Sequence, residues 1–322
     1  MGLGKHALYQ IDLLKEFRPD IKISYLVDNS IASYYRFLDK FNNKVNSTFS
    51  TSIIHSFKSS NPDLIYISTL ADSHVEIAMN LIENGFHKDI IIEKPLSNSL
   101  EKANYLKNKI KEYKWNGDVY LGFYRRTNEL LNKVRDITLS GNLGSLKKIN
   151  LNKSVELSMN GSHWIDFANW IVPEKQVNIS SELIWNHSPG RRGSRILDPI
   201  CKLNISYKNG TEFYITPTYD FNKDELIELE FTKGNILIND DEEIAKIKSE
   251  NDDKEIYIPK SKDNSFLNFI NYIENENSNL PKIEEGLNVL ETVFAAHISD
   301  QLNKKVPFPV DTKMTKFSLN VG

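Results

Sequence analysis

The first 123 residues alternate between short apolar segments and segments of helical periodicity, and this alternation constrains the fold more than any other feature. The apolar, β-branched runs typical of strands lie at 21–27, 63–69, 89–92 and 118–123. Segments of helical periodicity lie at 5–17, 30–41, 73–83 and 100–113. Strands separated by helices form βαβ units with right-handed crossovers, so we expect a Rossmann-like, doubly wound parallel sheet with helices on both faces.

After residue 123 the pattern changes from alternation to a run of strands. Helices are predicted at 127–140 and 162–171, around a strand at 146–152. Further strands are predicted at 177–185, 200–207, 212–218, 226–231, 235–239 and 255–259, and closing helices at 265–274 and 283–302. The polar segment 243–253 is expected to form a solvated hairpin edge. We therefore expect an α/β dinucleotide-binding domain over 1–123 and, over 124–322, an α+β substrate-binding and oligomerisation domain with a mostly antiparallel open sheet.

The segment Gly2-Leu3-Gly4-Lys5-His6-Ala7 reads Gly-x-Gly-x-x-Ala and opens directly into a helical pattern. In such a motif the first glycine makes a tight turn, the second lets a pyrophosphate approach the backbone, and the third small residue lets helix and strand pack closely. The helix N-terminus presents free N–H groups to the phosphates. The sequence therefore predicts a dinucleotide site at Gly2, Gly4 and Ala7.

Asp28 ends the next predicted strand, close to the ~20-residue spacing at which the motif places an acid for the ribose hydroxyls. Asn29 and Ser30 follow it, and neither carries the positive charge that would bind a 2′-phosphate. We therefore expect NAD in preference to NADP. The alternative interpretation is that Asp28 caps the following helix.

The motif normally follows a strand, yet only Met1 precedes Gly2 in this sequence. The missing strand is usually the central one of the sheet, and without it neighbouring backbone groups would lack partners. We expect either that the natural start lies upstream or that the domain lacks its middle strand.

Five segments, in order along nearly the whole chain, resemble one enzyme family. They are Asp63-Leu-Ile-Tyr-Ile-Ser-Thr69 with His74, Ile91-Ile92-Glu93-Lys94-Pro95-Leu96, Gly122-Phe-Tyr-Arg-Arg126, Gly161-Ser162-His163-Trp164-Ile165-Asp166, and Ala295-Ala296-His297-Ile298-Ser299 ahead of Pro307. Together these segments are similar to those of the glucose–fructose oxidoreductase and inositol dehydrogenase family (Gfo/Idh/MocA). The Glu-Lys-Pro segment is the most specific of them.

The resemblance implies two catalytic residues, Lys94 and His163. It implies a cis peptide between Lys94 and Pro95, with the ammonium directed at the substrate hydroxyl to polarise it. A histidine titrates in the right range to exchange the hydroxyl proton, which is the implied role of His163. The alternatives are a surface lysine and a packed core histidine.

The resemblance also assigns other residues to cofactor binding or to substrate binding. Thr69, His74 and Glu93 would lie at the cofactor, although His74 also fits a polar residue at a helix start. Tyr124, Arg126, Asn160 and Asp166 would contact substrate. Arg126 suits an anionic group on the substrate but also a salt bridge at the domain interface. Asp166 could orient His163, since it follows at i+3, or pair within its helix. The basic loop 190–193 could reach a phosphate, although a solvated loop is the simpler interpretation.

The sequence departs from the family where a carboxylate usually sits four residues before His163, because that position is Met159. Either Lys94 and His163 suffice, or Asn160 or Tyr124 replaces the contact, or catalysis is lost. The family's Thr-Pro turn is also changed here, to Thr69-Leu70.

Composition excludes several other classes of function. Lysine and arginine are interleaved with acidic residues and the net charge is −3, so no basic stripe for nucleic acid exists. No apolar run approaches the ~20 residues of a membrane span, and the seven histidines lack metal-ligand spacing. The single cysteine, Cys201, excludes an internal disulfide and suits a cytoplasmic protein, in which we expect it to be packed in the core.

These observations predict a cytoplasmic oxidoreductase that transfers a hydride between NAD and a sugar, polyol or nucleotide-linked sugar, with Lys94 and His163 handling the hydroxyl proton. The alternative is a catalytically silent nucleotide- or sugar-binding protein that retains the fold. The second domain is expected to keep one open sheet face. Because an apolar open face would bind a partner, we expect a homodimer or homotetramer.

Overall fold

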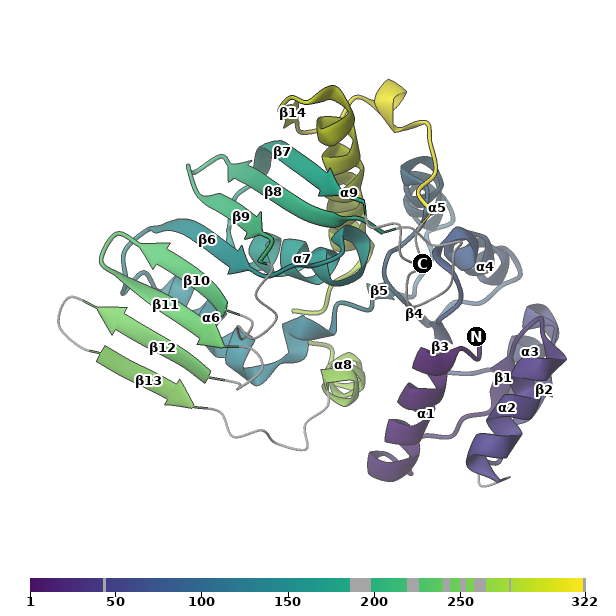
Figure 1. Cartoon of the computed structure of the whole chain (residues 1–322). Coiled ribbons are helices and arrows are strands. Elements are labelled where there is room, and N and C mark those ends of the chain that lie inside the picture. Colours follow the sequence, from purple (N-terminus) through teal and green to yellow (C-terminus); the bar gives the residue numbers. More distant parts are fainter. Residues whose placement is uncertain are drawn as a thin grey trace. The chain divides into compact units, whose positions relative to one another are not determined.

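The structure is a computed structural model of the chain (Figure 1). It describes residues 1–42, 45–185, 198–218, 226–239, 244–249, 253–257, 265–277 and 279–320. The chain divides into two compact units, the first of Met1–Phe123 with Phe266–Leu287 and the second of Tyr124–Ser265 with Asn288–Asn320. The segment Phe266–Leu287, which we expected in the second domain, thus belongs to the first unit.

The first unit has the predicted alternation of strands and helices. Its parallel strands form two groups, β1 (Tyr25–Val27) with β2 (Thr48–Ser50), and β3 (Leu64–Ile67), β4 (Asp89–Ile92) and β5 (Val119–Leu121) in that order. Its helices are α1 (Lys5–Phe17), α2 (Ile31–Phe41), α3 (Ile53–Ser60), α4 (Ala71–Glu83) and α5 (Leu100–Glu112). Strand β2 and helix α3 are the two elements that the sequence did not predict.

Met1 and Gly2 lie where a central strand would join the two groups. The Gly2 N–H donates to the Val27 carbonyl oxygen at the end of β1 (2.8 Å). The Ser68 N–H, just past β3, donates to the Met1 carbonyl oxygen, also at 2.8 Å. These two residues therefore satisfy backbone groups of both β1 and the β3 region, and the parallel α/β fold is confirmed.

Helix α8 (Ser265–Glu274) supplies aromatic side chains to the first unit. Tyr66 and Tyr120 flank Ile91 in register, so all three point from the same face of the parallel sheet. The Phe266 ring packs at 5.7 Å from the Tyr66 ring, and the Phe269 ring lies edge-on to Tyr120 at 6.3 Å. A segment late in the sequence thus covers this face of the sheet.

The second unit is built on a mixed sheet whose described strands run in the order β13-β12-β11-β10-β6-β9-β8-β7-β14. All neighbouring pairs are antiparallel except β6 with β9. The strands are β6 (Leu146–Asn152), β7 (Gln176–Ile184), β8 (Ile200–Tyr207), β9 (Glu212–Thr216), β10 (Leu226–Phe231), β11 (Gly234–Asn239), β12 (Ile244–Ser249), β13 (Asp253–Tyr257) and β14 (Val306–Pro307). This confirms the mostly antiparallel second domain.

Three further helices complete this unit. They are α6 (Glu129–Ser140), α7 (Ser162–Ile171) and the greater part of α9 (Ile283–Leu302). The end of α9 is tied to β7, because the Ser181 and Leu183 N–H groups donate to Ser299 Oγ and Asp300 Oδ1. The predicted hairpin edge at 243–253 contains β12, which pairs with β11 on one side and β13 on the other.

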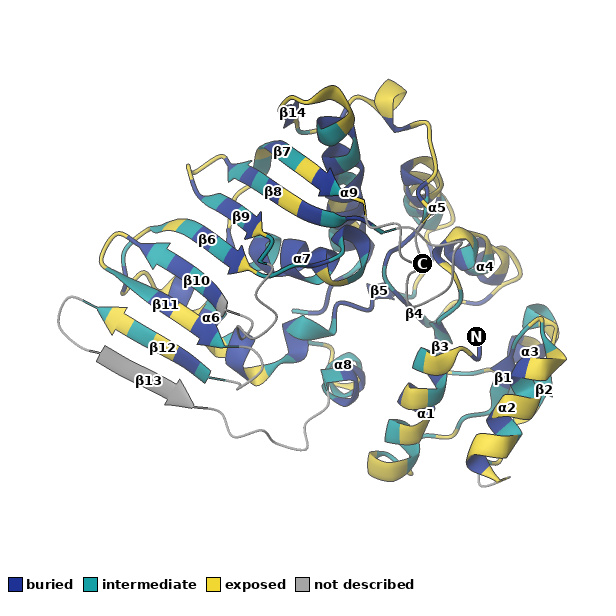
Figure 2. Cartoon of the chain, viewed as in Figure 1, coloured by how far each residue is buried: buried dark blue, intermediate teal, exposed yellow. Residues whose placement is uncertain are grey.

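One face of this sheet is apolar and the other polar, as the alternating burial along β7 and β8 shows (Figure 2). The polar face carries paired groups such as Lys202 with Glu182 (3.3 Å) and Asn150 with Glu230 (2.9 Å). The open sheet that we expected is confirmed, and the outward positions of its strands carry polar side chains such as these. The oligomeric state itself stays a prediction.

No described helix is long and apolar enough to cross a membrane.

Candidate functional site

Gly2 forms a turn that no other residue could form. Its φ angle is +82°, and a Cβ built on it would lie 2.6 Å from the Ser68 carbonyl oxygen. Both the left-handed backbone and the close approach therefore require glycine here. This turn lies beside the end of β1, where the Val27 carbonyl oxygen accepts from the Gly2 N–H, and it leads directly into α1.

Gly4 leaves an open space at the start of α1. It is the N-cap residue, and a Cβ built on it would meet no atom within 4 Å. No side chain caps this helix start and its first turn has no acidic residue. Uncapped N–H groups at a helix start favour a bound anion, so the open space at Gly4 is a candidate phosphate site. Ala7, one turn on, is 4% exposed, as the motif requires of its third small residue.

Asp28 lies directly beside the glycine turn. Its carboxylate accepts hydrogen bonds from the Leu3 and Ser30 N–H groups, both at 2.8 Å. Each oxygen retains a second lone pair, because a carboxylate accepts about four hydrogen bonds. The geometry therefore suits a carboxylate that is fixed by the backbone and able to accept from ligand hydroxyls.

Two exposed apolar residues lie close in sequence to the expected cofactor residues, and neither was predicted to be a site residue. Ile31, the first residue of α2, is 60% exposed, and Leu70, the N-cap of α4, is 51% exposed. Each follows an expected cofactor residue, Asp28 or Thr69, within three positions. The only available signal was an apolar residue at the beginning of a helix, where polar residues are usual.

His74 is buried and its ring joins two loops. Nδ1 lies 2.9 Å from the Pro95 carbonyl oxygen and Nε2 lies 3.1 Å from that of Thr69. Burial lowers the pKa of His74, so the neutral ring donates to one of the two carbonyls. The structure thus places His74 as a link between the Thr69 loop and the Lys94–Pro95 turn. The peptide bond of that turn is cis, as the resemblance implies.

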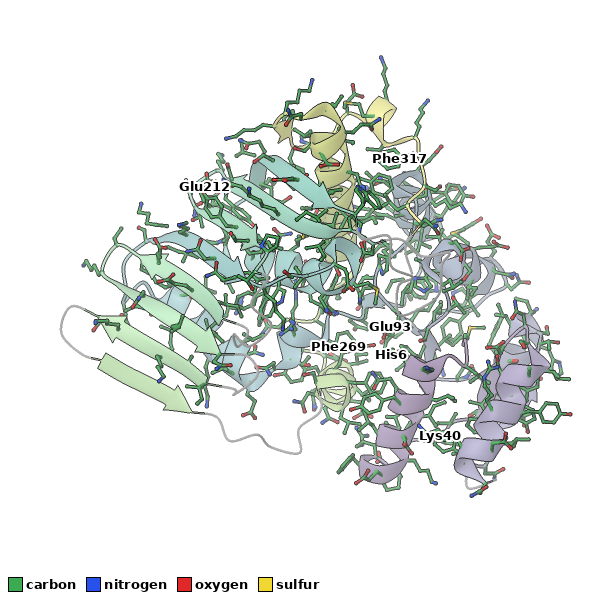
Figure 3. All side chains as sticks on the ribbon, viewed as in Figure 1. His6, Lys40, Glu93, Glu212, Phe269 and Phe317 are labelled. Carbon is green, nitrogen blue, oxygen red and sulfur yellow. The ribbon has the colours of Figure 1, made fainter. Side chains whose placement is uncertain are left out.

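Glu93 follows β4, immediately before Lys94, and its carboxylate is tightly surrounded. Oε1 accepts from the Tyr66 hydroxyl at 2.6 Å and lies 3.1 Å from His6 Nε2. A Cβ at Gly122 would lie 3.0 Å from Oε2, a tight contact that the carboxylate would have to relieve by a small shift. Figure 3 shows His6 and Glu93 next to each other. Sequence reasoning missed His6, because it occupies a variable position of the glycine motif.

In the second unit, Arg126 and Asp166 bind each other. Asp166 Oδ2 accepts from Arg126 Nε at 2.9 Å, and Asp166 Oδ1 accepts from Nη2 at 2.7 Å. Their side chains are 7% and 1% exposed. This salt bridge lies inside the second unit and joins two different elements, so it is neither the domain-interface pair considered for Arg126 nor the within-helix pair considered for Asp166.

His163 lies in the first turn of α7, which continues from a π-helical turn, Leu157–Gly161. Met159 lies in this turn, and Asn160 beside it is exposed. The Asp198 carboxylate accepts from the Met159 N–H (2.7 Å) and the Ser158 N–H (2.9 Å). Nothing local in the sequence indicated Asp198, because it acts 40 residues away from Ser158.

Tyr124 begins a short 3₁₀ helix, Tyr124–Thr127, which also contains Arg126. The basic loop at 190–193 lies outside the described residues. Among those that the structure describes, no cluster of three or more His, Cys, Asp or Glu residues could hold a metal ion. Cys201 is buried, as expected, and burial raises the pKa of its thiol.

Residues 1–116 match the model of an oxidoreductase family with an NAD-binding Rossmann fold. No curated protein matches the chain. Many solved structures share the fold of the whole chain at low identity. The WlbA dehydrogenase from Bordetella pertussis, solved with NADH and UDP-GlcNAcA, has 15% identity and a TM-score of 0.73, covering 97% of this chain and 98% of its own.

An oxidoreductase from Agrobacterium radiobacter, in complex with NAD+, L-tartaric acid and magnesium, has 14% identity and a TM-score of 0.76, with 95% of this chain and 96% of that chain covered. The transcriptional regulator Gal80p from Kluyveromyces lactis has 15% identity and a TM-score of 0.75, with 92% and 86% covered. At these identities the likeness establishes the fold alone.

Proposed function

We propose that this chain, whose residues 1–116 carry the NAD-binding Rossmann domain of the Gfo/Idh/MocA oxidoreductase family, is a nicotinamide-dependent oxidoreductase of sugars, polyols or nucleotide-linked sugars. The observation that supports the proposal is the contrast between Gly2 and Gly4. The first is sterically required by the turn, whereas the second leaves open space at the start of α1. A phosphate group would fit that space and receive the N–H groups of the first turn.

The proposal favours NAD over NADP because of Asp28. Its carboxylate is held by the Leu3 and Ser30 N–H groups and would accept from ribose hydroxyls. The same negative charge would repel a 2′-phosphate. Neither Asn29 nor Ser30 supplies a compensating positive charge. Exposed Ile31 and Leu70 add apolar surface suited to a flat heteroaromatic ring.

The bound dinucleotide would supply the hydride donor or acceptor. The protein must therefore accept or donate the proton of the substrate hydroxyl. The Lys94 ammonium would hydrogen-bond the reacting oxygen, and the His163 imidazole would accept or return the hydroxyl proton. The Glu93 carboxylate, held by the Tyr66 hydroxyl, would keep the strand end before Lys94 in place.

The turn before His163 also bears on this mechanism. Met159 can neither accept a proton nor hold a charge, but the Asp198 carboxylate binds the Met159 N–H. A carboxylate therefore lies at this turn even though position 159 lacks one. Its hydrogen bonds to two successive N–H groups would hold the π-helical turn that leads to His163.

The second candidate function is a silent nucleotide- or sugar-binding protein. Met159 favours it, and so does the shared fold with Gal80p, a transcriptional regulator. A silent nucleotide-binding protein would bind a dinucleotide as the enzyme would, but only the enzyme would turn it over.

The deciding experiment is a fluorescence titration of the purified chain with NADH and NADPH, followed by a screen of polyols and sugars for change in NADH absorbance. We expect NADH to bind more tightly than NADPH, and Lys94→Ala to abolish turnover while NADH still binds. Exposed Lys114→Ala is the matched control. Binding without turnover of any substrate would favour the silent protein. No binding of either dinucleotide would refute the enzyme and the nucleotide-binding form of the silent protein, and would leave only the sugar-binding form.

We further propose a cytoplasmic homodimer or homotetramer, which light scattering at micromolar concentration would test. A monomer would refute this part of the proposal.

A further inference from the structure

A line of hydrogen-bonding side chains connects the glycine motif to the strand end that carries Lys94. Gln10 Nε2 lies 3.2 Å from His6 Nε2, which lies 3.1 Å from Glu93 Oε1, and the Tyr66 hydroxyl donates to the same oxygen. The His6 side chain is 41% exposed, whereas that of Glu93 is only 11% exposed (Figure 3). His6 thus lies between Gln10 and Glu93 and is far more exposed to solvent than either of them.

The two neighbours of His6 Nε2 require opposite protonation states of this nitrogen. The Glu93 carboxylate can only accept, so it requires an N–H at Nε2. The Gln10 amide nitrogen can only donate, so it requires a lone pair there. Gln10 Oε1 is buried without a hydrogen-bond partner among the described residues. Rotating the amide by a half turn would present this oxygen to a protonated Nε2, so the arrangement suits either state of the ring.

The other ring nitrogen, Nδ1, has no hydrogen-bond partner among the residues that the structure describes. His6 belongs to the first turn of α1, immediately after the open space at Gly4. A neutral ring that donates from Nε2 to Glu93 cannot also donate from Nδ1. Only the imidazolium donates from both nitrogens, to Glu93 on one side and to a ligand oxygen on the other.

The charged and titratable groups around His6 come from three elements. Glu93 faces it from the end of β4, with Lys94 next along the chain, and the Tyr66 phenol from β3. Lys5 is its neighbour on α1. From helix α8, the apolar Phe266 ring packs on Tyr66. Glu93 is therefore the group that directly stabilises a positive charge on His6.

We propose that His6 takes up a proton from solvent when an anionic dinucleotide binds, and that the resulting imidazolium bridges Glu93 and a phosphate oxygen of the ligand. This inference rests on the proposed dinucleotide function. Histidine is the side chain whose charge most readily changes near neutral pH, and a phosphate anion beside it favours the charged form. Dinucleotide affinity therefore decreases as pH rises, because binding must acquire a proton that becomes scarcer.

Calorimetric titration with NADH at pH 7.5, in two buffers of different ionisation enthalpy, measures the protons taken up on binding. We expect the wild-type chain to take up a measurable fraction of one proton and His6→Gln, which keeps a donor toward Glu93, to take up none. Between pH 6.5 and 8.5 the wild-type affinity should fall, by at most about tenfold per pH unit for one proton, while that of His6→Gln stays level. Exposed His87→Gln is the matched control and should behave as wild type.

Each outcome bears on a different claim. NADH binding by wild type with no proton uptake, or with uptake undiminished in His6→Gln, overturns the role of His6 but leaves the proposed function standing. No NADH binding by wild type overturns the proposed function and the inference together. If thermal melting shows that His6→Gln is unfolded, His6→Asn, whose amide replaces Nδ1, provides the same comparison.

Discussion

The guanidinium of Arg126 and the carboxylate of Asp166 form a two-pronged ion pair in the interior of the second unit, through bonds of 2.9 and 2.7 Å. The pair joins the 3₁₀ helix Tyr124–Thr127 to α7, the helix that carries His163. Both side chains are nearly inaccessible to solvent, so each charge is balanced by the other. The resemblance suggested that these residues bind substrate, but the geometry favours a role in holding α7.

Replacing one partner of this pair should strongly destabilise the second unit. Asp166→Asn leaves the Arg126 charge buried without its counterion, at an expected cost of about 3–5 kcal/mol in the free energy of unfolding. Chemical denaturation would measure this loss. Replacing both residues together, as Arg126→Met with Asp166→Leu, should cost less than Asp166→Asn alone. If Asp166→Asn is as stable as wild type, the pair does not hold α7.

Gly4→Ala should separate ligand binding from folding. The added methyl group meets nothing in the protein, so only a loss of up to about 1 kcal/mol at the helix cap is expected. The same methyl group would occupy the space proposed for a phosphate, and overpacking of about 1–3 kcal/mol corresponds to about tenfold or more in NADH affinity. Fluorescence titration and thermal melting would measure the two effects.

Gly2→Ala is the comparison for that experiment. Its methyl group would lie 2.6 Å from the Ser68 carbonyl oxygen, and its φ is +82°. We therefore expect Gly2→Ala to lower the melting temperature, in contrast to Gly4→Ala. Unchanged NADH affinity in Gly4→Ala would place the phosphates elsewhere.

The fold was predictable from sequence where its signals were local. Helix α1 and strand β4 have the predicted bounds, because each shows its periodicity or apolar run over the whole element. Strand β2 was missed because Thr48–Ser50 offers only three residues, one of them apolar. Helix α3 was missed because Ile53–Ser60 is two turns long and contains three serines. Helix α8 was predicted in position but not in the unit it joins, since that depends on contacts of Phe266 and Phe269 with distant strands.

The candidate site likewise has a part that local sequence signals predict and a part that depends on long-range contacts. Gly2, Gly4 and Asp28 follow from one short motif and its spacing, and the structure brings them together at one turn. His6 and Glu93 are 87 residues apart, and the pairing depends on how α1 and β4 are arranged. The bonds of Asp198 to the turn before His163 are likewise a product of folding. A sequence pattern indicates which chemistry a side chain can perform. Which neighbour it acts on is decided by long-range contacts such as these, which form only when the chain folds.

Asp28 should control the choice between the two dinucleotides. In Asp28→Ala, loss of a charged hydrogen-bond acceptor worth about 1.5–3 kcal/mol should weaken NADH binding by about tenfold or more. The affinity for NADPH should fall less or rise, because the repulsion of its 2′-phosphate is removed. Titration with both dinucleotides would give the ratio. Asp63→Ala, at a carboxylate whose side chain is 99% exposed, is the control, and an unchanged ratio in Asp28→Ala would contradict this role.

The stability of the second unit should decrease in mild acid because of His297. This residue of α9 lies with its ring 5.9 Å from that of Trp185, and burial lowers its pKa from 6.5 to about 4, against a smaller opposing effect of Asp300. Between these two pH values the unfolded chain binds a proton that the folded chain does not. The free energy of unfolding therefore falls as the pH drops from above 6.5 toward 4.

His297→Gln removes this titration and should flatten the pH dependence. Urea denaturation at pH 7.5 and pH 5 would show a smaller loss of stability in the variant than in wild type. A residual loss of the same sign is expected from His74, because burial lowers its pKa too. Since His74 lies in the first unit, following the unfolding through Trp185 or another tryptophan of the second unit would separate the two histidines. An equal loss in wild type and His297→Gln would show that the neutral form of His297 does not stabilise the fold.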